Sequence, residues 1–349
     1  MEQLFKRNIN NPLLTPDMFA VKDQLKVIGS FNPGACLYKD KVVLLVRVAY
    51  ASNKQDEDSI STIIYSEKNR QLESVSFNKK DLDSYEERVF FYNEKLFLTS
   101  LSVFYLVTID KYGNLEISSG PVLYPENILE EYGIEDPRIT KIKDTYFITY
   151  VGVSRHGQTV LLSSTKDFKS FKKHGSILPP NNKDVVIFPE KINGKYYILH
   201  RPSVEGVPAP EMWYAESKDL ISWTKHKPFM QSKFKWEDGR IGAGPPPIKT
   251  EIGWLIFYHA ATKNNIYSMG AVLVDLEDIS KVLWRSKEPL IIPKTSYELT
   301  GYFSDVVFIT GSVKDKNNIL KLYYGAADSS TYEINCDLNI LIKRITEDM

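Results

Sequence analysis

The sequence has little of what would place it in several large classes of protein. Its two cysteines, Cys36 and Cys336, are too few and too far apart for a disulfide framework or a metal-binding motif, although a bridge between them stays open. No apolar run approaches the roughly 20 residues of a membrane helix. The first eight residues, MEQLFKRN, lack the apolar core of a signal peptide. We therefore expect a soluble, cytoplasmic protein.

Net charge is also absent. Lys and Arg together number 44, and so do Asp and Glu, which gives a formal charge of zero. Proteins that bind nucleic acid or anionic membranes through a broad surface usually carry excess positive charge, so neither partner is expected and a cationic site must be local. The five histidines are scattered, and no metal site is predicted from them.

Signals for α-helix are scarce. The notable candidate is the stretch around Pro125 to Tyr132, whose glutamates suit the first turn of a helix. Aromatic residues are abundant instead, at 12% of the chain with 21 Tyr and 17 Phe, which favours β-structure. The chain contains no linker or low-complexity tract, and we expect one domain spanning residues 1–349.

A polar turn followed by a run of apolar or aromatic residues recurs along the chain. Turn residues ahead of such a run are a hairpin signal, and Asn193-Gly194 is the strongest instance. The six turns begin at Lys39, Asn93, Lys143, Asn193, Glu251 and Asn317. A second repeat supports the first, because the segment 164–171 resembles 217–223 and each follows its hairpin turn at a similar distance.

Together the two repeats define a unit of about 50 residues, which is typical of the four-stranded blades of a β-propeller. A long β-sandwich is the alternative. The N-terminal segment 11–16 contains two prolines and should be extended, and we expect it to complete the last blade.

In a propeller, polar residues beside the apolar runs can face one central funnel. The stretch from Gly133 to Ile139 is the most concentrated, with Glu135, Asp136 and Arg138 close together. A loop that caps itself with a local ion pair is the alternative for this stretch. The recurrence of such residues at one place in the repeat favours a shared site. The candidates are Asn32, Arg47, Glu135, Asp136, Arg138, Lys183, Glu190, Lys191, His200, Arg201, Arg240, His259, Tyr267 and Asp328.

Several of these candidates suit an oxyanion such as phosphate. The set comprises the cationic side chains and one hydroxyl donor, namely Lys183, Arg201, Arg240, His259 and Tyr267. Asp136 is then the isolated acid, whose pKa burial would raise and Arg138 would lower. The loop 242–247 lacks the Gly-Lys-Ser/Thr of a P-loop, and its prolines remove backbone donors. We interpret it as a rigid loop whose backbone packs closely against its neighbours and positions Arg240.

Seven segments in this order resemble glycoside hydrolase family 130, the mannoside phosphorylases and related mannosidases. They are Phe31–Gly34 with Arg47, Gly133–Ile139, Phe188–Ile192, Leu199–Pro202, Gly242–Pro247, Tyr258–His259 and Tyr324–Asp328. The resemblance implies an all-β, five-bladed propeller with its active site in the central funnel. Since six hairpin turns were counted, we expect the Asn93 turn to add strands within an early blade.

The resemblance also implies roles. Asp136 would be the catalytic acid, and the substrate side would comprise Asn32, Arg47, Glu135, Arg138 and Asp328, of which Glu135 and Arg138 would orient the acid. Phosphate would be held by Lys183, Arg201, Arg240, His259 and Tyr267. Arg240 stands where the family leads us to expect lysine.

The implied reaction is inverting phosphorolysis of a β-mannoside. Inorganic phosphate is a co-substrate that attacks the anomeric carbon, Asp136 protonates the departing oxygen through a mannose hydroxyl, and no cofactor is needed. The products are α-mannose 1-phosphate and the shortened sugar. The segments 96–102 and 130–133 resemble the branch that acts on β-1,2-mannobiose or β-1,2-oligomannan, except that Val103 replaces a histidine near the expected acceptor side.

Three alternatives stay open. One is a β-mannoside hydrolase, which needs a second carboxylate as base, such as Glu190. Another is a phosphorylase of β-1,4-mannosyl-glucose or β-1,4-mannosyl-N-acetylglucosamine, and the third is a non-catalytic sugar-binding propeller. The sequence leaves open the linkage, the chain length of the substrate and whether the chain forms a homo-oligomer.

Overall fold

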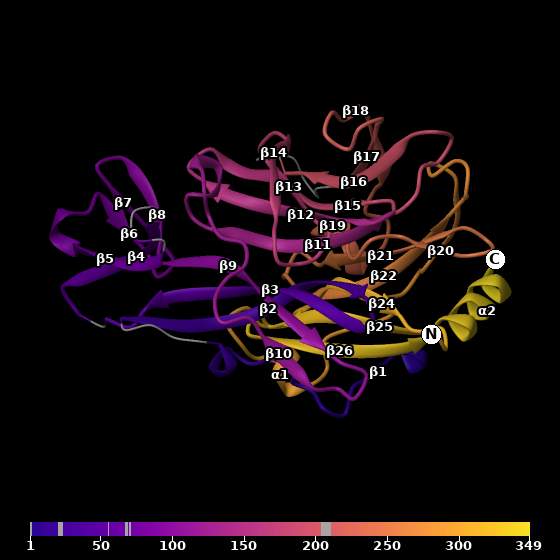
Figure 1. The fold of residues 1–349 in the computed structure, drawn as a ribbon, viewed down its shortest axis with the longest axis horizontal. Helices are drawn as coiled ribbons and strands as arrows, with labels where there is room; N and C mark the ends of the chain where they lie inside the picture. Colours follow the sequence, from indigo (N-terminus) through magenta and orange to yellow (C-terminus); the bar gives the residue numbers. More distant parts are fainter. Residues whose placement is uncertain (1, 20–23, 55, 67–68, 70, 204–210) are drawn as a thin grey trace.

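The body of the molecule consists of antiparallel sheets that follow one another along the chain (Figure 1). The computed structural model describes residues 2–19, 24–54, 56–66, 69, 71–203 and 211–349. Within these ranges, five sheets have four or five strands each. Two smaller sheets are formed by a segment that is inserted in the sequence between two strands of the first sheet. The alternation of short turns and apolar runs in the sequence produces these hairpins.

In the first four large sheets the strands appear in sequence order from one edge to the other, and in the fifth the N-terminal strand is added beside the last strand. The first sheet contains β2 (Leu25–Tyr38), β3 (Lys41–Ser52), β9 (Ser100–Ile109) and β10 (Leu115–Ile117). The second contains β11 (Ile134–Ile142), β12 (Thr145–Ser154), β13 (Gly157–Thr165) and β14 (Lys172–Leu178). The third contains β15 (Asn182–Ile187), β16 (Tyr196–Pro202), β17 (Met212–Ser217) and β18 (Thr224–Met230).

The last two sheets are built in the same way. The fourth contains β19 (Arg240–Ala243), β21 (Trp254–Ala261), β22 (Tyr267–Val274) and β23 (Val282–Arg285), with β20 (Ile248–Lys249) paired to β21. The fifth contains β24 (Val307–Lys314), β25 (Ile319–Ala326), β26 (Ser330–Asp337) and β1 (Lys6–Arg7). The N-terminal strand β1 thus completes the last sheet, whereas the segment 11–16 that was expected to do so adds an isolated bridge between Leu14 and Thr331 of β26.

The five sheets close into a ring. The first strand of the first sheet, β2, contacts both β11 and β24, so the first sheet touches the second and the fifth. Further contacts join β11 to β15, β15 to β19, and β22 to β24. This cyclic order is the five-bladed β-propeller that was expected, with β2, β11, β15, β19 and β24 nearest the axis.

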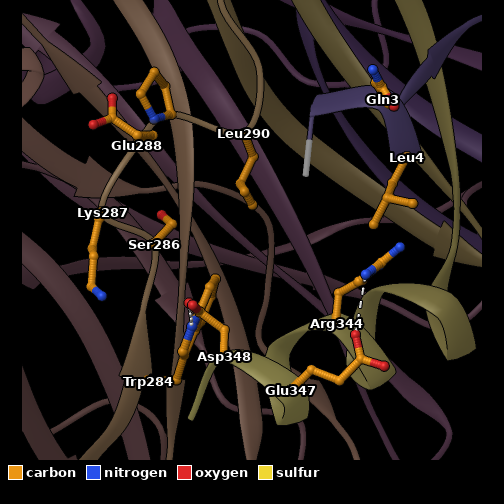
Figure 2. Close-up of a pocket in the computed structure, with 11 residues that line it drawn as sticks. Gln3, Leu4, Trp284, Ser286, Lys287, Glu288, Leu290, Arg344, Glu347 and Asp348 are labelled. Atoms are coloured by element: carbon orange, nitrogen blue, oxygen red, sulfur yellow. Dashed lines mark hydrogen bonds and ion pairs between the residues drawn. The ribbon is translucent and has the colours of Figure 1, made fainter.

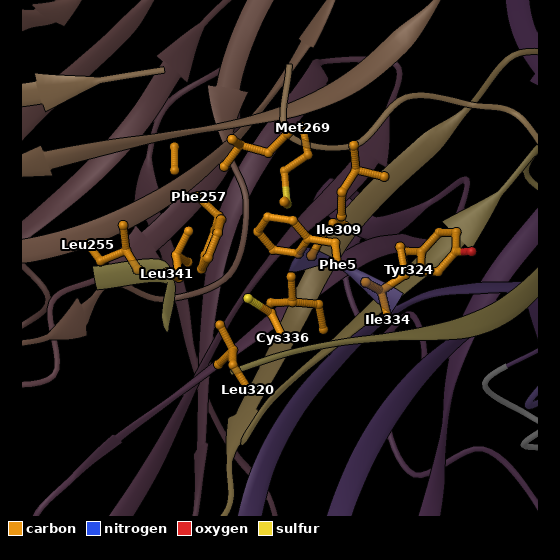
Figure 3. Close-up of a cluster of buried hydrophobic side chains, with 14 of the residues drawn as sticks. Phe5, Leu255, Phe257, Met269, Ile309, Leu320, Tyr324, Ile334, Cys336 and Leu341 are labelled. Atoms are coloured by element: carbon orange, nitrogen blue, oxygen red, sulfur yellow. The ribbon is translucent and has the colours of Figure 1, made fainter. Parts of the chain in front are cut away.

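Apolar side chains fill the spaces between neighbouring blades. Between the fourth and fifth blades, Phe5 packs edge-on against Phe257 with ring centroids 6.4 Å apart, among residues that include Cys336 (Figure 3). Cys36 is buried in a different cluster, between the first and second blades. Both cysteines are free, so the bridge that the sequence left open does not form.

An insertion separates the second and third strands of the first blade. It contains the hairpin β4 (Ser59–Ser66) and β5 (Gln71–Asn78) and the small sheet of β6 (Ser84–Tyr85), β7 (Val89–Tyr92) and β8 (Lys95–Leu98). It projects sideways from the ring, at the left of Figure 1. The Asn93 turn joins β7 and β8, so it interrupts the first blade but pairs with none of that blade's strands. This added element explains why six hairpin turns occur in a five-bladed ring.

The helix expected at 125–132 is wrong, since this stretch contains only the 3₁₀ turn η4 (Ile128–Glu130). The buried Glu130 carboxylate there accepts hydrogen bonds from Tyr150 Oη at 2.9 Å and Lys173 Nζ, so it ties the loop to the second blade. Glutamate at this position therefore reflects tertiary contacts and not a helical first turn.

The structure contains a C-terminal helix that the sequence analysis missed, α2 (Leu338–Asp348), as well as the short α1 (Ser296–Leu299). Asp337 caps α2 by accepting from the backbone N–H groups of Asn339 and Ile340, and the buried side chains recur at three- and four-residue spacing. Among the described residues, none of the helices has the length and apolar character that crossing a bilayer would require.

The N-terminal strand is tied to the ring by one buried ion pair. Arg7 Nε lies 2.7 Å from Glu298 Oε1, and Tyr324 donates to the same oxygen at 2.8 Å. The Glu298 side chain is fully buried. Burial would raise the pKa of Glu298, but Arg7 and the backbone N–H groups of Lys294 and Thr295 hold it below its usual value.

Arg7→Met should lower the free energy of unfolding by about 3 kcal/mol, because it leaves the Glu298 charge buried without its partner. Urea unfolding followed by fluorescence measures this change. The matched control is Lys6→Met, which alters the exposed neighbouring residue of the same strand and should change stability little. Equal stability of the two variants would contradict a stabilising role for the ion pair.

Candidate active site

Bulges in the strands nearest the axis turn polar side chains towards the funnel. The pairing register shifts at Asn32 in β2, at Asp136 in β11 and at Asp184 in β15. All three residues have left-handed backbone, with φ of 49°, 52° and 54°. A bulge re-aims side chains beside functional sites, and here the same device recurs in three consecutive blades.

Asp136 accepts hydrogen bonds from two residues of the first blade. Asn32 Nδ2 and Arg47 Nη1 donate to its Oδ1 at 2.9 and 3.0 Å. Arg47 also donates to Glu135 Oε1 at 2.6 Å, and Arg138 Nη1 donates to the backbone oxygen of Asp136 at 2.8 Å. The stretch thus pairs chiefly with Arg47 across the blade boundary, and not as a self-capping loop.

The sequence left open whether the surroundings of Asp136 raise or lower its pKa, and the structure shows that they favour the charged form. Burial alone would raise its pKa, but Arg47, Arg138 and the hydrogen bond from Asn32 outweigh burial and lower it. Asp136 is therefore ionised at neutral pH in the ligand-free site.

Asp328 has the opposite balance. It follows β25, has left-handed backbone with φ of 50°, and is only partly exposed. The pKa of Asp328 is raised to about 6, chiefly by burial. The positive charge of Arg47 opposes this rise, and the negative charges of Asp136 and Glu135 add to it. These three carboxyl groups thus surround one guanidinium, and the pKa values of Asp136 and Asp328 are shifted in opposite directions.

A buried ion cluster lies at the axis on the other side of Asp136. Asp184 accepts from Arg201 Nε at 2.7 Å, lies 3.4 Å from Arg138 Nη2 and lies 3.3 Å from His259 Nε2. Burial would raise the pKa of Asp184, but Arg201, His259 and Arg138 hold it well below its usual value. A side chain at Gly242 would collide with Asp184 and His259, so only glycine fits there.

Arg240, Tyr267 and Lys183 border this cluster. Arg240 Nε donates to the Tyr267 hydroxyl oxygen at 2.7 Å, which leaves the phenolic hydrogen able to donate elsewhere. Burial and the nearby Arg201 lower the pKa of Lys183, which lies close enough to Glu135 and Asp136 for both to act on it. The cationic half of the site therefore adjoins the carboxyl half.

His259 does not contribute the positive charge that the sequence analysis gave it. Burial, with smaller effects from Arg201 and Arg138, lowers its pKa and outweighs the opposing effect of Asp184, so the imidazole is neutral at neutral pH. The permanent cations of this half are Arg201 and Arg240, and Lys183 is the third basic side chain.

The residues around the axis fall into two layers. The side chains of Arg47, Glu135 and Asp136 are 16%, 24% and 13% exposed, and Lys183, Arg240, Tyr267 and Asp328 are also partly exposed. Arg138, Asp184 and His259 are each about 1% exposed and lie beneath. The contacts of Arg138 are therefore those of a residue that supports the site and links its two halves. This agrees with the expectation that Arg138 orients Asp136, which was made together with its placement on the substrate side.

Three candidates lie away from this arrangement. Glu190 is exposed at the surface in an ion pair with Lys249, and the amino group of Lys191 lies over the Tyr196 ring. His200 is buried against Asn182 and His226, and burial together with His226 lowers its pKa to about 3. Glu190 is thus excluded as a base in the funnel.

A hollow of about 690 Å³ at the outer edge of the ring also lies elsewhere (Figure 2). It is bordered by Trp284 of β23 and by Arg344 and Asp348 of α2, and none of the predicted site residues lines it. The candidate site therefore rests on the convergence of side chains at the axis and not on this surface hollow.

Sequence reasoning missed two residues, Asp184 and Ser102. Asp184 occupies the same place in its blade as Asn32 and Asp136, and that correspondence could have identified it. Arg47 Nε donates to Ser102 Oγ at 3.0 Å. Val103, where a histidine was expected near the acceptor, is fully buried among apolar residues of the first blade and does not face the funnel.

Fold and site together define a carbohydrate-active propeller enzyme. Residues 73–343 match the family model described as beta-1,4-mannooligosaccharide phosphorylase, and the chain belongs to this family, glycoside hydrolase family 130. The resemblance seen in the sequence is thereby confirmed.

Two relatives are similar over much of the chain. The beta-1,2-mannobiose phosphorylase of Listeria innocua is 42% identical over 95% of this chain and 94% of its own. The 1,2-beta-oligomannan phosphorylase of a Thermoanaerobacter species is 44% identical over 60% of this chain and 70% of its own.

Solved structures agree with the fold. The Listeria innocua beta-1,2-mannobiose phosphorylase in complex with beta-1,2-mannobiose superposes with a TM-score of 0.89, covering 98% of this chain and 99% of that one. A family member described as a hydrolase of beta-1,2 mannosidic linkages in Candida mannan has a TM-score of 0.73 at 22% identity, covering 95% and 93% of the two chains. At that identity the likeness shows the fold alone.

Asp184→Asn should lower the free energy of unfolding by about 3 to 5 kcal/mol, because Arg138 and Arg201 would lose their buried counter-charge. Urea unfolding measures the change. The double variant Asp184→Asn with Arg201→Met should recover part of the loss, since it removes one of the unpaired charges. A single variant as stable as the wild type would show that the cluster does not stabilise the ring.

Asp328→Asn should become more stabilising as the pH rises. The folded-state pKa of Asp328, about 6, exceeds the usual value of 3.8, so its contribution to stability is complete below about pH 4 and is lost as the pH rises through about 6. Asparagine stays neutral throughout. Urea unfolding of variant and wild type between about pH 4 and about pH 8 measures the difference, with the exposed Asp40→Asn as control. A difference that does not change with pH would contradict the raised pKa.

Proposed function

We propose that this protein is an inverting phosphorylase that cleaves β-1,2-mannosides with inorganic phosphate to give α-mannose 1-phosphate and the shortened sugar. The observation that carries the proposal is the adjacency of Asp136 to a cluster of basic side chains, Lys183, Arg201 and Arg240. One carboxyl group beside an oxyanion site suffices when the nucleophile is itself an anion.

In the proposed reaction, phosphate lies against the cationic half and attacks the anomeric carbon from the face opposite the departing oxygen. A phosphate oxygen forms the new bond to carbon while the glycosidic bond breaks. The proton that the departing oxygen needs comes from Asp136 through a mannose hydroxyl, in the manner implied by the family. Asn32, Arg47 and Asp328 would hold the mannosyl unit around that carboxyl group.

Asp136 is ionised in the empty site, so its ability to donate a proton must depend on a bound ligand. The Arg47 and Arg138 charges favour its carboxylate in the empty site. Bound phosphate would place negative charge near Asp136 and offset those cations, which raises the pKa of the carboxyl group. Phosphate would thus supply the nucleophile and also favour the protonated acid. We further propose that no cofactor takes part.

A hydrolase is the second candidate, because the funnel contains carboxyl groups besides Asp136. An inverting hydrolase needs one of them to activate water. Asp328 has a pKa of about 6, suited to a base at neutral pH, although Arg47 lies between it and the other carboxyl groups. The cationic half favours the phosphorylase, since a hydrolase would leave Lys183 and Arg240 without an anion among the ion pairs of the described residues.

The β-1,2 linkage is supported by the relatives, which are named for β-1,2-mannobiose and 1,2-β-oligomannan. The replacement of histidine by Val103 raises no objection, since Val103 points into the core.

The purified protein should release mannose 1-phosphate from β-1,2-mannobiose only when phosphate is present, because the phosphate oxygen becomes part of the product. The measurement is product analysis with β-1,2- and β-1,4-linked mannobiose and with mannosyl-glucose, each with and without phosphate. Free mannose released at equal rates in both conditions would favour the hydrolase. Preference for a β-1,4-linked substrate would refute the proposed linkage.

Asp136→Asn should lower kcat by about 10³-fold, since asparagine cannot donate the proton and general acids typically contribute about 10² to 10⁴. The matched control is Asp144→Asn in the exposed turn before β12, which should leave kcat unchanged. If Asp136→Asn retains wild-type activity, Asp136 is not the acid.

A further inference from the structure

The insertion of the first blade returns to the ring at Arg88, in the turn between β6 and β7. Its guanidinium carbon lies 4.2 Å from the centre of the Tyr302 ring and 5.5 Å from that of Phe303. Arg88 Nη2 also donates to the backbone oxygen of Tyr302 at 3.0 Å. The two residues are 214 positions apart, and Tyr302 lies in the connection between the fourth and fifth blades. We call this contact the Arg88–Tyr302 clasp.

The clasp stands beside the candidate active site. Phe303 N donates at 3.0 Å to the backbone oxygen of Ala327, the residue before Asp328. The charge of Arg88 acts on the Asp328 carboxyl group and opposes the rise that burial causes in its pKa. Arg88 therefore lies at the rim of the funnel on the side of Asp328.

The turn that carries Arg88 is fixed to the insertion by its backbone. Thr99 N donates to the backbone oxygen of Arg88, and Thr99 Oγ1 donates to that of Glu87, both at 3.1 Å. The Arg88 side chain itself is exposed. Removing it would thus break the clasp without removing the contacts that hold the turn.

A groove of about 570 Å³ lies on the other side of the same turn. Glu87 and Thr99 line it together with Lys26 and Ala51, which pair across β2 and β3. Ala51 lies on the same face of β3 as Arg47, and four residues of strand span about 13 Å. In this turn, Glu87 therefore borders the groove and Arg88 borders the rim of the funnel.

We propose that the Arg88–Tyr302 clasp determines the chain length of the substrate, an inference that rests on the proposed function. In a phosphorylase that removes one mannosyl unit, the remaining sugar units extend out of the funnel past its rim. With the clasp closed, the turn separates the funnel from the groove and limits the room for a third sugar unit. Arg88 is then a specificity-determining residue, and the groove is space for a neutral, polyhydroxyl chain when the clasp is absent.

The test compares kcat/KM for β-1,2-mannobiose and β-1,2-mannotriose, with saturating phosphate, in the wild type and Arg88→Ala. The ratio of trisaccharide to disaccharide should rise at least about three-fold in the variant, because an exposed cation–π contact is worth about two- to five-fold in an equilibrium constant. Tyr302→Ala should give the same change. Arg88→Lys should give a smaller one, since lysine keeps the charge but not the planar stacking.

Lys111→Ala is the matched control. Lys111 makes the same kind of contact with Tyr112, at 4.9 Å in the turn between β9 and β10, and neither residue lines the groove. Its ratio should equal that of the wild type.

An unchanged ratio in Arg88→Ala, or a parallel loss with both substrates, would overturn the inference, since a merely structural role lowers both values alike. These outcomes leave the proposed function standing, because the wild type still cleaves the disaccharide with phosphate. A wild type that cleaves no β-mannoside would overturn the proposed function and this inference together.

Discussion

The arrangement at the axis depends on one buried guanidinium. Arg138 reaches the backbone oxygen of Asp136 with one nitrogen and Asp184 with another, and its exposed fraction is about 1%. A charge so deeply buried is tolerated only when its hydrogen-bonding capacity is used, and the backbone oxygens of Ala243 and Gly244 accept the rest. This single side chain thereby joins the second, third and fourth blades and fixes where the carboxyl half of the site meets the cationic half.

The left-handed bulges explain why such tight links are needed. Residues other than glycine in this conformation cost about 1 to 3 kcal/mol each and persist when their surroundings hold them. Asn32, Asp136 and Asp184 are each held by partners from a neighbouring blade, which for Asp184 are Arg138 and His259. The cost of the conformation is thus offset by contacts that exist only when the ring is closed, which couples the geometry of the site to the integrity of the fold.

Electrostatics divides the site into parts with different tasks. The buried layer of Arg138, Asp184 and His259 sets directions and charge balance, while the accessible layer around Arg47, Asp136, Lys183 and Arg240 is able to meet ligands. The separation also explains why fold alone does not determine reaction type. A hydrolase of the family shares the ring at 22% identity, so the reaction must depend on which side chains the bulges and loops present.

The sequence by itself determined the repeating hairpins, the ring of blades and most of the side chains at the axis, because turn residues and apolar runs are local signals. It also marked Asp136 as the central acid. Only the tertiary structure decided the charge states, since the pKa values of Asp136, Asp328 and His259 depend on partners that are distant in sequence. The same holds for Glu190, which the ring turns to the surface, for Asp184, and for the clasp between Arg88 and Tyr302. These relations join residues from different blades, and no local pattern specifies how closely two blades approach.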